Sequence, residues 1–474
     1  MRELSSARHA RLICIAYALV TGVLAGAAAL LIPIETADPV VSFRWIAPAS
    51  VAVIASMAWF GGIWTATSVY ALIFWCFHFG LVVVLGTAWA GVEDLSVWEL
   101  SWLLGPHAVD AAILSLAGLL AFACGSALVF ARRLPSHPAR GASSVSDPVV
   151  HAYGAAGSML VFGTIGVWCL IVVSTGGPGG FFVSYEDYRA MTTPYGDVLA
   201  VIWMVLGLGL VLSVTGRPGG LRTAAAATFA AFSLVALPLG LRSEVMFRGM
   251  AALVAAARCG RGLSSKRALA LGVALLAVIP IVREVRNTGL SGLSDAVLAP
   301  RFYEALAEMG GSLNPVEKVV RWHAEGEPFD GGRSYWAPIE RAAARVLPGL
   351  VVSKADNDMR ITSVLVTDRV GAIGFSPVAE AYRNFGGAGV VIVLGLFGAA
   401  LAAIDSIRER RPAVFALAIV YVPMLMNIRN TFIFVPAHLA GGVALLAVLA
   451  ASRHVLGSVV RRPYARPAYI RSEV

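Results

Sequence analysis

Residues 108–130 read AVDAAILSLAGLLAFACGSALVF, and apolar stretches of this kind decide the fold. Asp110 is the only charged side chain in the stretch, and about 20 such residues cross roughly 30 Å of hydrocarbon as a helix. Similar runs recur along the 474-residue chain, of which 58% is hydrophobic and only 14% charged. A soluble domain has about 25% charged residues. The composition therefore predicts an all-α, polytopic integral membrane protein and excludes disordered, collagen-like and disulfide-rich scaffolds.

Hydropathy along the chain predicts about twelve transmembrane helices. We place them near residues 12–33, 46–63, 66–88, 108–130, 153–174, 195–215, 222–240, 244–258, 267–283, 387–404, 412–427 and 431–451. The first is longer than the apolar core of a signal peptide and has no obvious small-x-small cleavage site. We therefore expect it to be a retained anchor.

The basic residues lie mainly in alternate loops. With the N-terminus inside, the cytoplasmic segments hold clusters within residues 2–11, 132–140, 217–222, 258–267, 408–411 and 453–471. The positive-inside rule then predicts an N-in, C-in topology. The net charge of +9 thus reflects topology, and we expect no nucleic-acid partner. The five cysteines show no CxxC or Cys/His spacing, so no zinc site is predicted.

The predicted spans divide the chain into four parts. Residues 1–283 hold about nine transmembrane helices, 284–386 form one large helical external loop, 387–451 hold the last three helices, and 452–474 form a basic cytoplasmic tail. In the loop, Asn314-Pro315-Val316-Glu317 has the pattern of a capping box, with Gly326 as the stop. A second helix is predicted from Pro338 to Leu347, after the separator Gly331-Gly332.

The segment 374–387, which reads GFSPVAEAYRNFGG, carries a compact polar group. Ser376 is expected to cap a short helix that Gly386-Gly387 ends before the next span. Glu380, Arg383 and Asn384 share one face of that helix, and an apolar face backs them. The simpler alternative is an interfacial helix whose Glu380 and Arg383 pair at i,i+3.

Arginines at the outer ends of spans form a second group. Positive charge outside opposes the orientation rule, so it needs another cause. One cause is binding of a phosphate, which guanidinium groups hold by bidentate hydrogen bonds. The alternatives are snorkelling to the interface and local pairing, as of Glu244 with Arg248 at i,i+4. The group comprises Arg242, Arg283, Arg286 and Arg429.

Other polar residues give weaker signals. Asp356-Asn357-Asp358 satisfies a DxD pattern that can hold a divalent metal, although so short a pattern is common by chance. His323, on the first predicted external helix, is a candidate base, with a plain surface position as the simpler interpretation. The motifs GxxxxGK[ST], HExxH and GxSxG are absent from the sequence.

The arrangement resembles the bacterial Wzy-type oligosaccharide repeat-unit (O-antigen) polymerases. These proteins have many spans, a large external loop before the last three, and an acid, an aromatic residue and Asn-Phe-Gly ahead of a span. Two further segments are similar: Gly332-Arg333-Ser334-Tyr335 followed by Pro338, and Gly240-Leu241-Arg242-Ser243. The residues that match the main motif are Glu380, Tyr382, Asn384, Phe385, Gly386 and Gly389.

The resemblance implies a GT-C-like polymerase or ligase architecture in the bacterial inner membrane, with the active site facing the periplasm. It implies inverting glycosyl transfer that needs no metal and no cofactor. The donor would be a glycan on undecaprenyl diphosphate and the acceptor a second lipid-linked repeat unit, and a chain-length regulator is a further partner that the family suggests. The product would be an O-antigen, capsule or exopolysaccharide.

The resemblance also suggests a role for each candidate residue. Glu380 would be the base, and Arg242, Arg286 and Arg429 would stabilise the departing lipid diphosphate. Arg383 would hold Glu380 ionised, or Glu380 would only orient Arg383. The residues expected to bind substrate are Tyr382, Arg383, Asn384, Arg283 and Tyr335.

Three other functions remain open from the sequence. An O-antigen-type ligase, which moves a finished glycan to another acceptor, would have a similar architecture. A glycosyltransferase that uses polyprenyl-phosphate sugars is a second alternative. A lipid-linked glycan flippase or transporter differs in class, and such proteins tend to show related halves and broken helices at mid-membrane. The chain shows no such halves.

Overall fold

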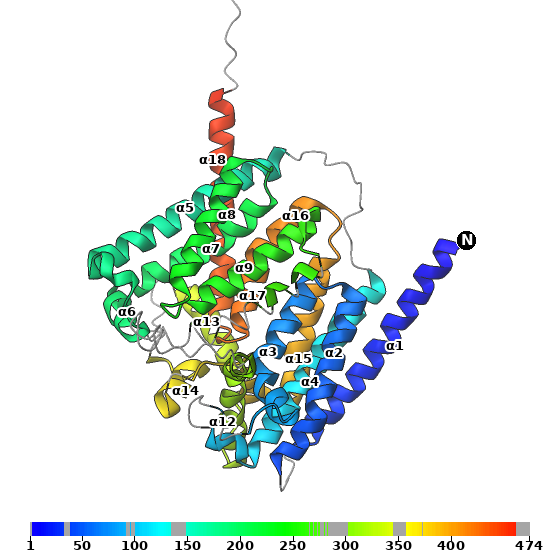
Figure 1. Ribbon diagram of the computed structural model, residues 1–474. Coiled ribbons are helices and arrows are strands. Elements are labelled where there is room, and N and C mark those ends of the chain that lie inside the picture. The colour runs from blue at the N-terminus through cyan, green and yellow to red at the C-terminus, as the bar shows by residue number, and fades with distance from the viewer. Residues whose placement is uncertain are drawn as a thin grey trace, which may run out of the picture.

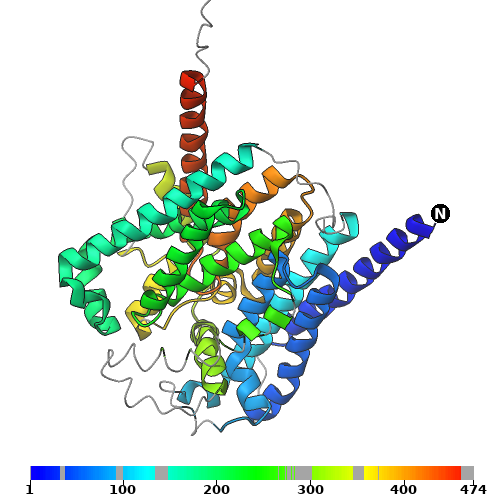
Figure 2. The ribbon, with the colours of Figure 1, turned by 45° about the horizontal axis from the view of Figure 1, so that its top comes forward.

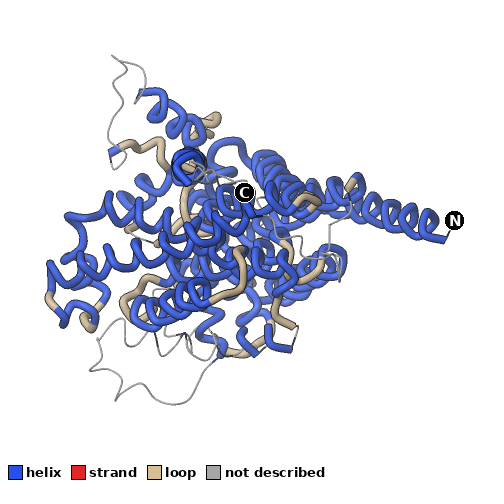
Figure 3. The backbone as a smooth tube through the Cα atoms, turned by 90° about the horizontal axis from the view of Figure 1, so that it is seen from above, coloured by secondary structure: helices blue, strands red, loops and turns tan. Residues whose placement is uncertain are grey.

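The computed structural model describes residues 2–32, 38–91, 95, 100–133, 148–264, 302–344, 357–371 and 373–460, with scattered positions between 266 and 282. In this part of the chain the regular secondary structure is entirely helical, as predicted (Figure 3). Turns and loops connect consecutive helices. No strand occurs among the described residues.

Eight helical segments among the described residues are long and apolar enough to cross a membrane, against the twelve or so predicted from hydropathy. The segment containing α7 is extended at its start by α6 (Tyr185–Thr192) and η3 (Thr193–Tyr195). The helices are α1 (Arg2–Leu30), α2 (Pro39–Gly61), α3 (Ala66–Gly86), α4 (His107–Arg132), α5 (Pro148–Gly176), α7 (Gly196–Thr215), α15 (Pro377–Asp405) and α18 (Phe434–Val460).

The other expected spans correspond to shorter helices. Residues 222–240 and 244–258 fall on α8 (Gly220–Ala236) and α9 (Arg242–Ala256). The expected span 412–427 is a run of α16 (Arg410–Ala416), the π-helical turn η8 (Leu417–Tyr421) and α17 (Val422–Asn427). The span predicted at 267–283 lies mostly outside the described residues.

The part predicted to be external consists of short helices. They are η1 (Ser101–Leu104), η2 (Pro178–Phe181), α11 (Phe302–Met309), η6 (Gly310–Ser312), α12 (Leu313–Ala324), α13 (Arg333–Ala344) and α14 (Thr362–Val370). The predicted stops are confirmed, because Gly326, Gly331 and Gly332 all have positive φ. The predicted helix starts are wrong: η6 leads directly into α12, so Asn314 caps nothing, and Pro338 lies inside α13.

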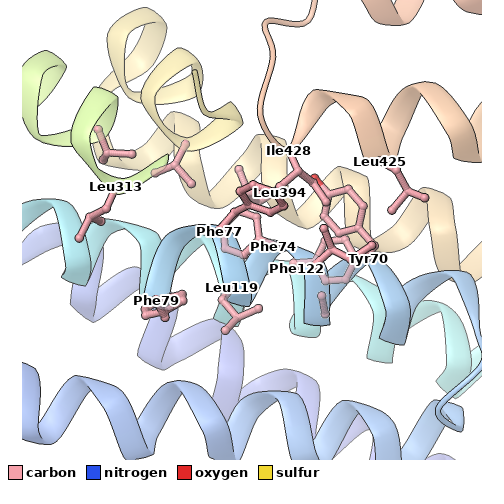
Figure 4. Packing of buried hydrophobic residues seen from close by; sticks show 14 of the residues in the cluster. Tyr70, Phe74, Phe77, Phe79, Leu119, Phe122, Leu313, Leu394, Leu425 and Ile428 are labelled. Atoms are coloured by element: carbon pink, nitrogen blue, oxygen red, sulfur yellow. The ribbon is translucent and has the colours of Figure 1, made fainter. Parts of the chain in front are cut away.

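The helices form two groups. Helices α1–α4 lie beside α15, and α5, α7 and α8 gather on the other side of the molecule (Figures 1 and 2). The first group has a core in which Tyr70 stacks on Phe122 with ring centroids 4.9 Å apart (Figure 4). This core also includes residues of α9, α12 and α17, so α12, which is predicted to be external, packs on the helices predicted to span the membrane.

Polar contacts fix α3 against α15 at both ends. At the predicted cytoplasmic end, the Asp405 carboxylate accepts hydrogen bonds from the amides of Ala66 (2.9 Å) and Thr67 (3.0 Å), at the first turn of α3. Toward the other end, His78 of α3 lies 2.7 Å from the hydroxyl of Ser376. The two antiparallel helices therefore hold one register, which sets the position of the segment that precedes the span of α15.

Small residues let α4 and α15 approach closely. A Cβ atom at Gly125 would lie 1.9 Å from the carbonyl oxygen of Gly395. We expect Gly125→Ala to lower the free energy of unfolding by about 1–3 kcal/mol, because backbone must move to make room. Thermal melting in detergent would measure the loss. The control is Gly163→Ala on α5, where nothing lies within 4 Å of the added atom; equal melting of the two variants would contradict the prediction.

Candidate functional site

The first turns of α15 form a separate short helix, as the sequence predicted. The Ser376 hydroxyl accepts a hydrogen bond from the Val378 amide at 3.1 Å, and Pro377 occupies the first turn. Gly386 has φ 66° and ψ −160°, a conformation that is essentially restricted to glycine. The break at Gly386 separates residues 377–385, which carry the polar group, from the membrane span.

Glu380 is the centre of a buried hydrogen-bond network. Its Oε1 accepts from the Ser334 hydroxyl (2.8 Å), and its Oε2 accepts from the Phe432 amide (2.7 Å). Asn384 Nδ2 donates to the Ser334 hydroxyl and to the Glu380 carbonyl oxygen, both at 2.8 Å. The carboxylate thus joins three elements: the external helix α13, the start of α15, and the turn before α18. Each carboxylate oxygen has a second lone pair with which it could accept a proton.

Glu380 and Asn384 of the polar group face the interior of the protein. Each is only 1% exposed, and Val378 and Ala381 of the apolar face are buried as well, whereas Phe385 is 47% exposed. Both faces of the helix are covered, because α13 lies against the polar side. Helical periodicity gives the residues that share a face, but it does not give the side that another element covers.

Arg383 binds a different acid from the one expected. Its Nε lies 2.8 Å from the Asp330 carboxylate, and no ion pair joins it to Glu380. The expected i,i+3 ion pair is therefore wrong for this structure, whereas the positive charge of Arg383 still favours the ionised form of Glu380 from a distance. The backbone strengthens the same junction, since the amides of Asp330 and Gly331 donate to the carbonyl oxygens of Arg383 and Asn384, each at 3.0 Å.

Aromatic rings surround the junction. Tyr335 stacks on Phe385 with centroids 6.2 Å apart and meets Phe432 edge-on at 5.2 Å. Burial raises the pKa of Tyr335 well above its ordinary value. Tyr382 packs edge-on against His323 at 5.6 Å. The His323 ring nitrogen Nδ1 lies 2.6 Å from the Glu327 carbonyl oxygen, so this histidine belongs to a packed cluster rather than to an open surface.

His78 is a residue of the site that the sequence analysis did not select. It is fully buried, and its two ring nitrogens contact the Phe74 carbonyl oxygen (3.0 Å) and the Ser376 hydroxyl (2.7 Å). A neutral ring that donates from Nδ1 would accept the Ser376 proton at Nε2. The two partners are 298 residues apart in sequence, so no spacing rule could have joined them.

The described outer arginines lie around the same end of the bundle. The Arg429 guanidinium carbon lies 5.7 Å from the centroid of the Phe77 ring, and Phe77 is 6.0 Å from Phe247 of α9. Arg242 begins α9 and forms an ion pair with Glu308 of α11. Phe77 and Phe247 thus connect the surroundings of Arg429 with α9, the helix that Arg242 begins. Arg283 and Arg286 lie outside the described residues.

The contacts of Arg248 differ from the ion pair with Glu244 that the sequence suggested. It is fully buried and donates to the carbonyl oxygens of Trp203 (2.7 Å) and Ser243 (3.2 Å), and it forms no ion pair with Glu244. Hydrogen bonds to backbone carbonyls satisfy a guanidinium inside a helical bundle. Arg248 thus ties α9 to α7.

Arginine side chains bind the described part of the DxD segment. Asp358 forms ion pairs with Arg341 (2.7 Å) and Arg360 (2.9 Å), and the hydrogen bonds from Arg360 lower its pKa to about 2. Asp356 lies outside the described residues. Within the described part of the chain, no group of three or more His, Cys, Asp or Glu side chains is arranged to hold a metal ion.

A recess of about 510 Å³ opens beside the network. Neither Arg242 nor Arg429 contributes to its lining. Its residues come from the turn before α13, from α13 itself and from the segment that precedes α14. They are Gly331, Gly332, Arg333, Trp336, Glu340 and Arg360.

Comparison with known proteins supplies the family. The sequence profile of O-antigen polysaccharide polymerase Wzy matches residues 66–451, which include every described element of the site. Protein CapE of Staphylococcus aureus is 31% identical over 165 residues, which cover 35% of this chain and 36% of CapE, so the match spans about a third of that relative. No solved structure matches the chain significantly. The chain belongs to the O-antigen polysaccharide polymerase Wzy family.

Proposed function

We propose that the protein joins undecaprenyl-diphosphate-linked oligosaccharide repeat units into a surface polysaccharide, by inverting and metal-independent transfer on the periplasmic face of the inner membrane. Family membership supports a membrane polysaccharide polymerase that acts on lipid-linked repeat units. The observation that carries the finer proposal is the position of Glu380. Its carboxylate is buried just ahead of a membrane span, between an external helix and the turn after Arg429.

The proposed reaction is a single displacement. A hydroxyl oxygen of the acceptor sugar attacks the anomeric carbon of the donor glycan. The bond from that carbon to the diphosphate oxygen breaks, and its electron pair leaves with the lipid diphosphate. The hydroxyl proton passes to Glu380, which acts as the general base. The acceptor would approach past the first turn of α13, where Ser334 covers the carboxylate.

Arginines would stabilise the charge that develops on the leaving group. Fixed guanidinium groups can replace a metal ion there, because they offer planar pairs of donors to phosphate oxygens. Arg242 and Arg429 are the described candidates, and Arg286 is proposed with them. Arg283, Tyr335, Tyr382, Arg383 and Asn384 remain the proposed substrate-binding residues. For Asn384 we propose an indirect role, since its amide is engaged with Ser334 and Glu380.

Elongation in vitro tests the proposal. We expect the purified, detergent-solubilised protein to convert purified lipid-linked repeat units into a ladder of longer chains, with EDTA present, and to release the lipid diphosphate. A ladder that disappears with EDTA and returns with a divalent cation would overturn the metal-independent step. Transfer only to an added acceptor of another kind, without a ladder, would instead identify a ligase.

A further inference from the structure

The recess beside α13 has an exposed aromatic ring in its lining that no core explains. Trp336 lines it and is 57% exposed. The ring of Phe385 lies close by, since a Cβ at Gly332 of the lining would lie 3.0 Å from it. A volume of about 510 Å³ lies within the range typical of small-molecule sites, roughly 300–1,000 Å³.

The polar side chains of the recess are mostly fixed in place. Arg360 binds Glu340 at 2.7 Å and also binds Asp358, so its guanidinium and both carboxylates are held in one orientation. Arg333 differs: its side chain is exposed, and it makes no ion pair with any described residue. The recess thus combines an apolar ring face, a rigid polar wall and one guanidinium that is open to a ligand.

The floor of the recess is bonded directly to the proposed active site. The Gly331 amide donates to the Asn384 carbonyl oxygen at 3.0 Å. Ser334, one residue after Arg333, donates to Glu380 at 2.8 Å. The recess and the carboxylate therefore share the first turn of α13, which presents Ser334 to Glu380 and Arg333 and Trp336 to the recess.

We propose that this recess binds a sugar ring of the acceptor glycan, with Trp336 as the stacking platform and Arg333 as a hydrogen-bond donor. A pyranose has an apolar C–H face, which suits the negative face of an aromatic ring, and a rim of hydroxyls, which suits fixed ions and guanidinium groups. The assignment of this sugar to an acceptor chain rests on the proposed function. The inference that the recess binds a sugar is independent of the proposed function.

The alternative ligand is the lipid interface. Tryptophan is common in the aromatic belts of membrane proteins, where the ring rests among headgroups. Trp45, near the start of α2, has the exposure expected of such a residue, at 77%. Trp336 differs because an ion pair and a further guanidinium, that of Arg333, line the same recess, whereas a belt residue needs only an apolar neighbourhood.

Binding of a lipid-free oligosaccharide tests the proposal. The probe is the set of fragments released by partial hydrolysis of the polysaccharide that the producing cell makes. They would be titrated into the full-length protein in detergent, with saturation-transfer NMR as the readout. We expect Trp336→Ala to weaken binding about tenfold, which corresponds to about 1.4 kcal/mol, and Trp336→Phe to weaken it less. Arg333→Ala should also weaken binding, and the control Trp45→Ala should not.

Two outcomes would decide the matter. Equal affinity of wild type, Trp336→Ala and Arg333→Ala would overturn the proposal, and so would a loss of fragment binding in Trp45→Ala as large as that in Trp336→Ala. Elongation assays run in parallel separate this inference from the proposed function. If wild type binds fragments through Trp336 but makes no ladder, the proposed function fails while the sugar site stands.

Discussion

Glu380→Gln is expected to abolish long polysaccharide while single lipid-linked repeat units accumulate. Loss of a general base typically lowers a rate by about 10²–10⁴-fold. The fold should survive, because the glutamine oxygen can accept from the Phe432 amide and its NH₂ can donate to the Ser334 hydroxyl, which rotates to accept it. Chain-length ladders from cells, together with elongation rates of the purified variant, would measure the effect.

The control for this prediction is Glu325→Gln, a like change at a largely exposed position directly after α12. It should leave the ladder intact. Melting in detergent should be similar for Glu380→Gln, Glu325→Gln and wild type. A normal ladder from a stably expressed Glu380→Gln protein would show that Glu380 takes no part in catalysis and has only a structural role.

Arg242→Ala is expected to have the second-largest effect. Removing one preorganised donor to a developing negative charge typically costs about 10²–10³-fold in rate. Arg242 also neutralises Glu308, so a loss of activity alone would not identify a contact with diphosphate. We therefore expect loss of the ladder both in Arg242→Ala and in the double variant Arg242→Ala/Glu308→Gln.

The double variant separates the two roles of Arg242. Glu308→Gln removes the buried acid that Arg242→Ala leaves without its counter-ion. The double variant should therefore recover the melting temperature that the single variant loses, while elongation stays absent. Recovery of elongation along with stability would show that Arg242 acts only through Glu308.

The all-helical, membrane-spanning class of the fold could be predicted from sequence because it depends on local properties. A run of apolar residues must be helical in lipid, whatever surrounds it. The stop at Gly386 and the cap at Ser376 could be predicted for the same reason, since each depends on a few neighbouring residues. The prediction of a capping box at Asn314 was wrong because a preceding helical turn, η6, leads directly into α12. A local sequence pattern contains no information about the element that comes before it.

The contacts of the site could not be predicted, because they join distant segments. Ser334 and Glu380 are 46 residues apart, and Arg242 and Glu308 are 66 apart. The residue types at Glu380, Arg383 and Asn384 were recognised, but their partners were not. A carboxylate and a guanidinium at i,i+3 are close enough to pair on a helix, and only the position of Asp330 shows that Arg383 has a better partner.

The bend at Gly386 affects how genetic screens of this protein would be interpreted. Any side chain there would oppose the backbone conformation and would also meet the ring of Phe329, at 3.2 Å from the new Cβ. Saturation mutagenesis should therefore find position 386 as intolerant as position 380, although glycine has no group that takes part in chemistry. Intolerance to substitution would therefore not distinguish a residue that shapes the backbone from one that takes part in catalysis. Rates measured on folded variants are needed to assign these roles.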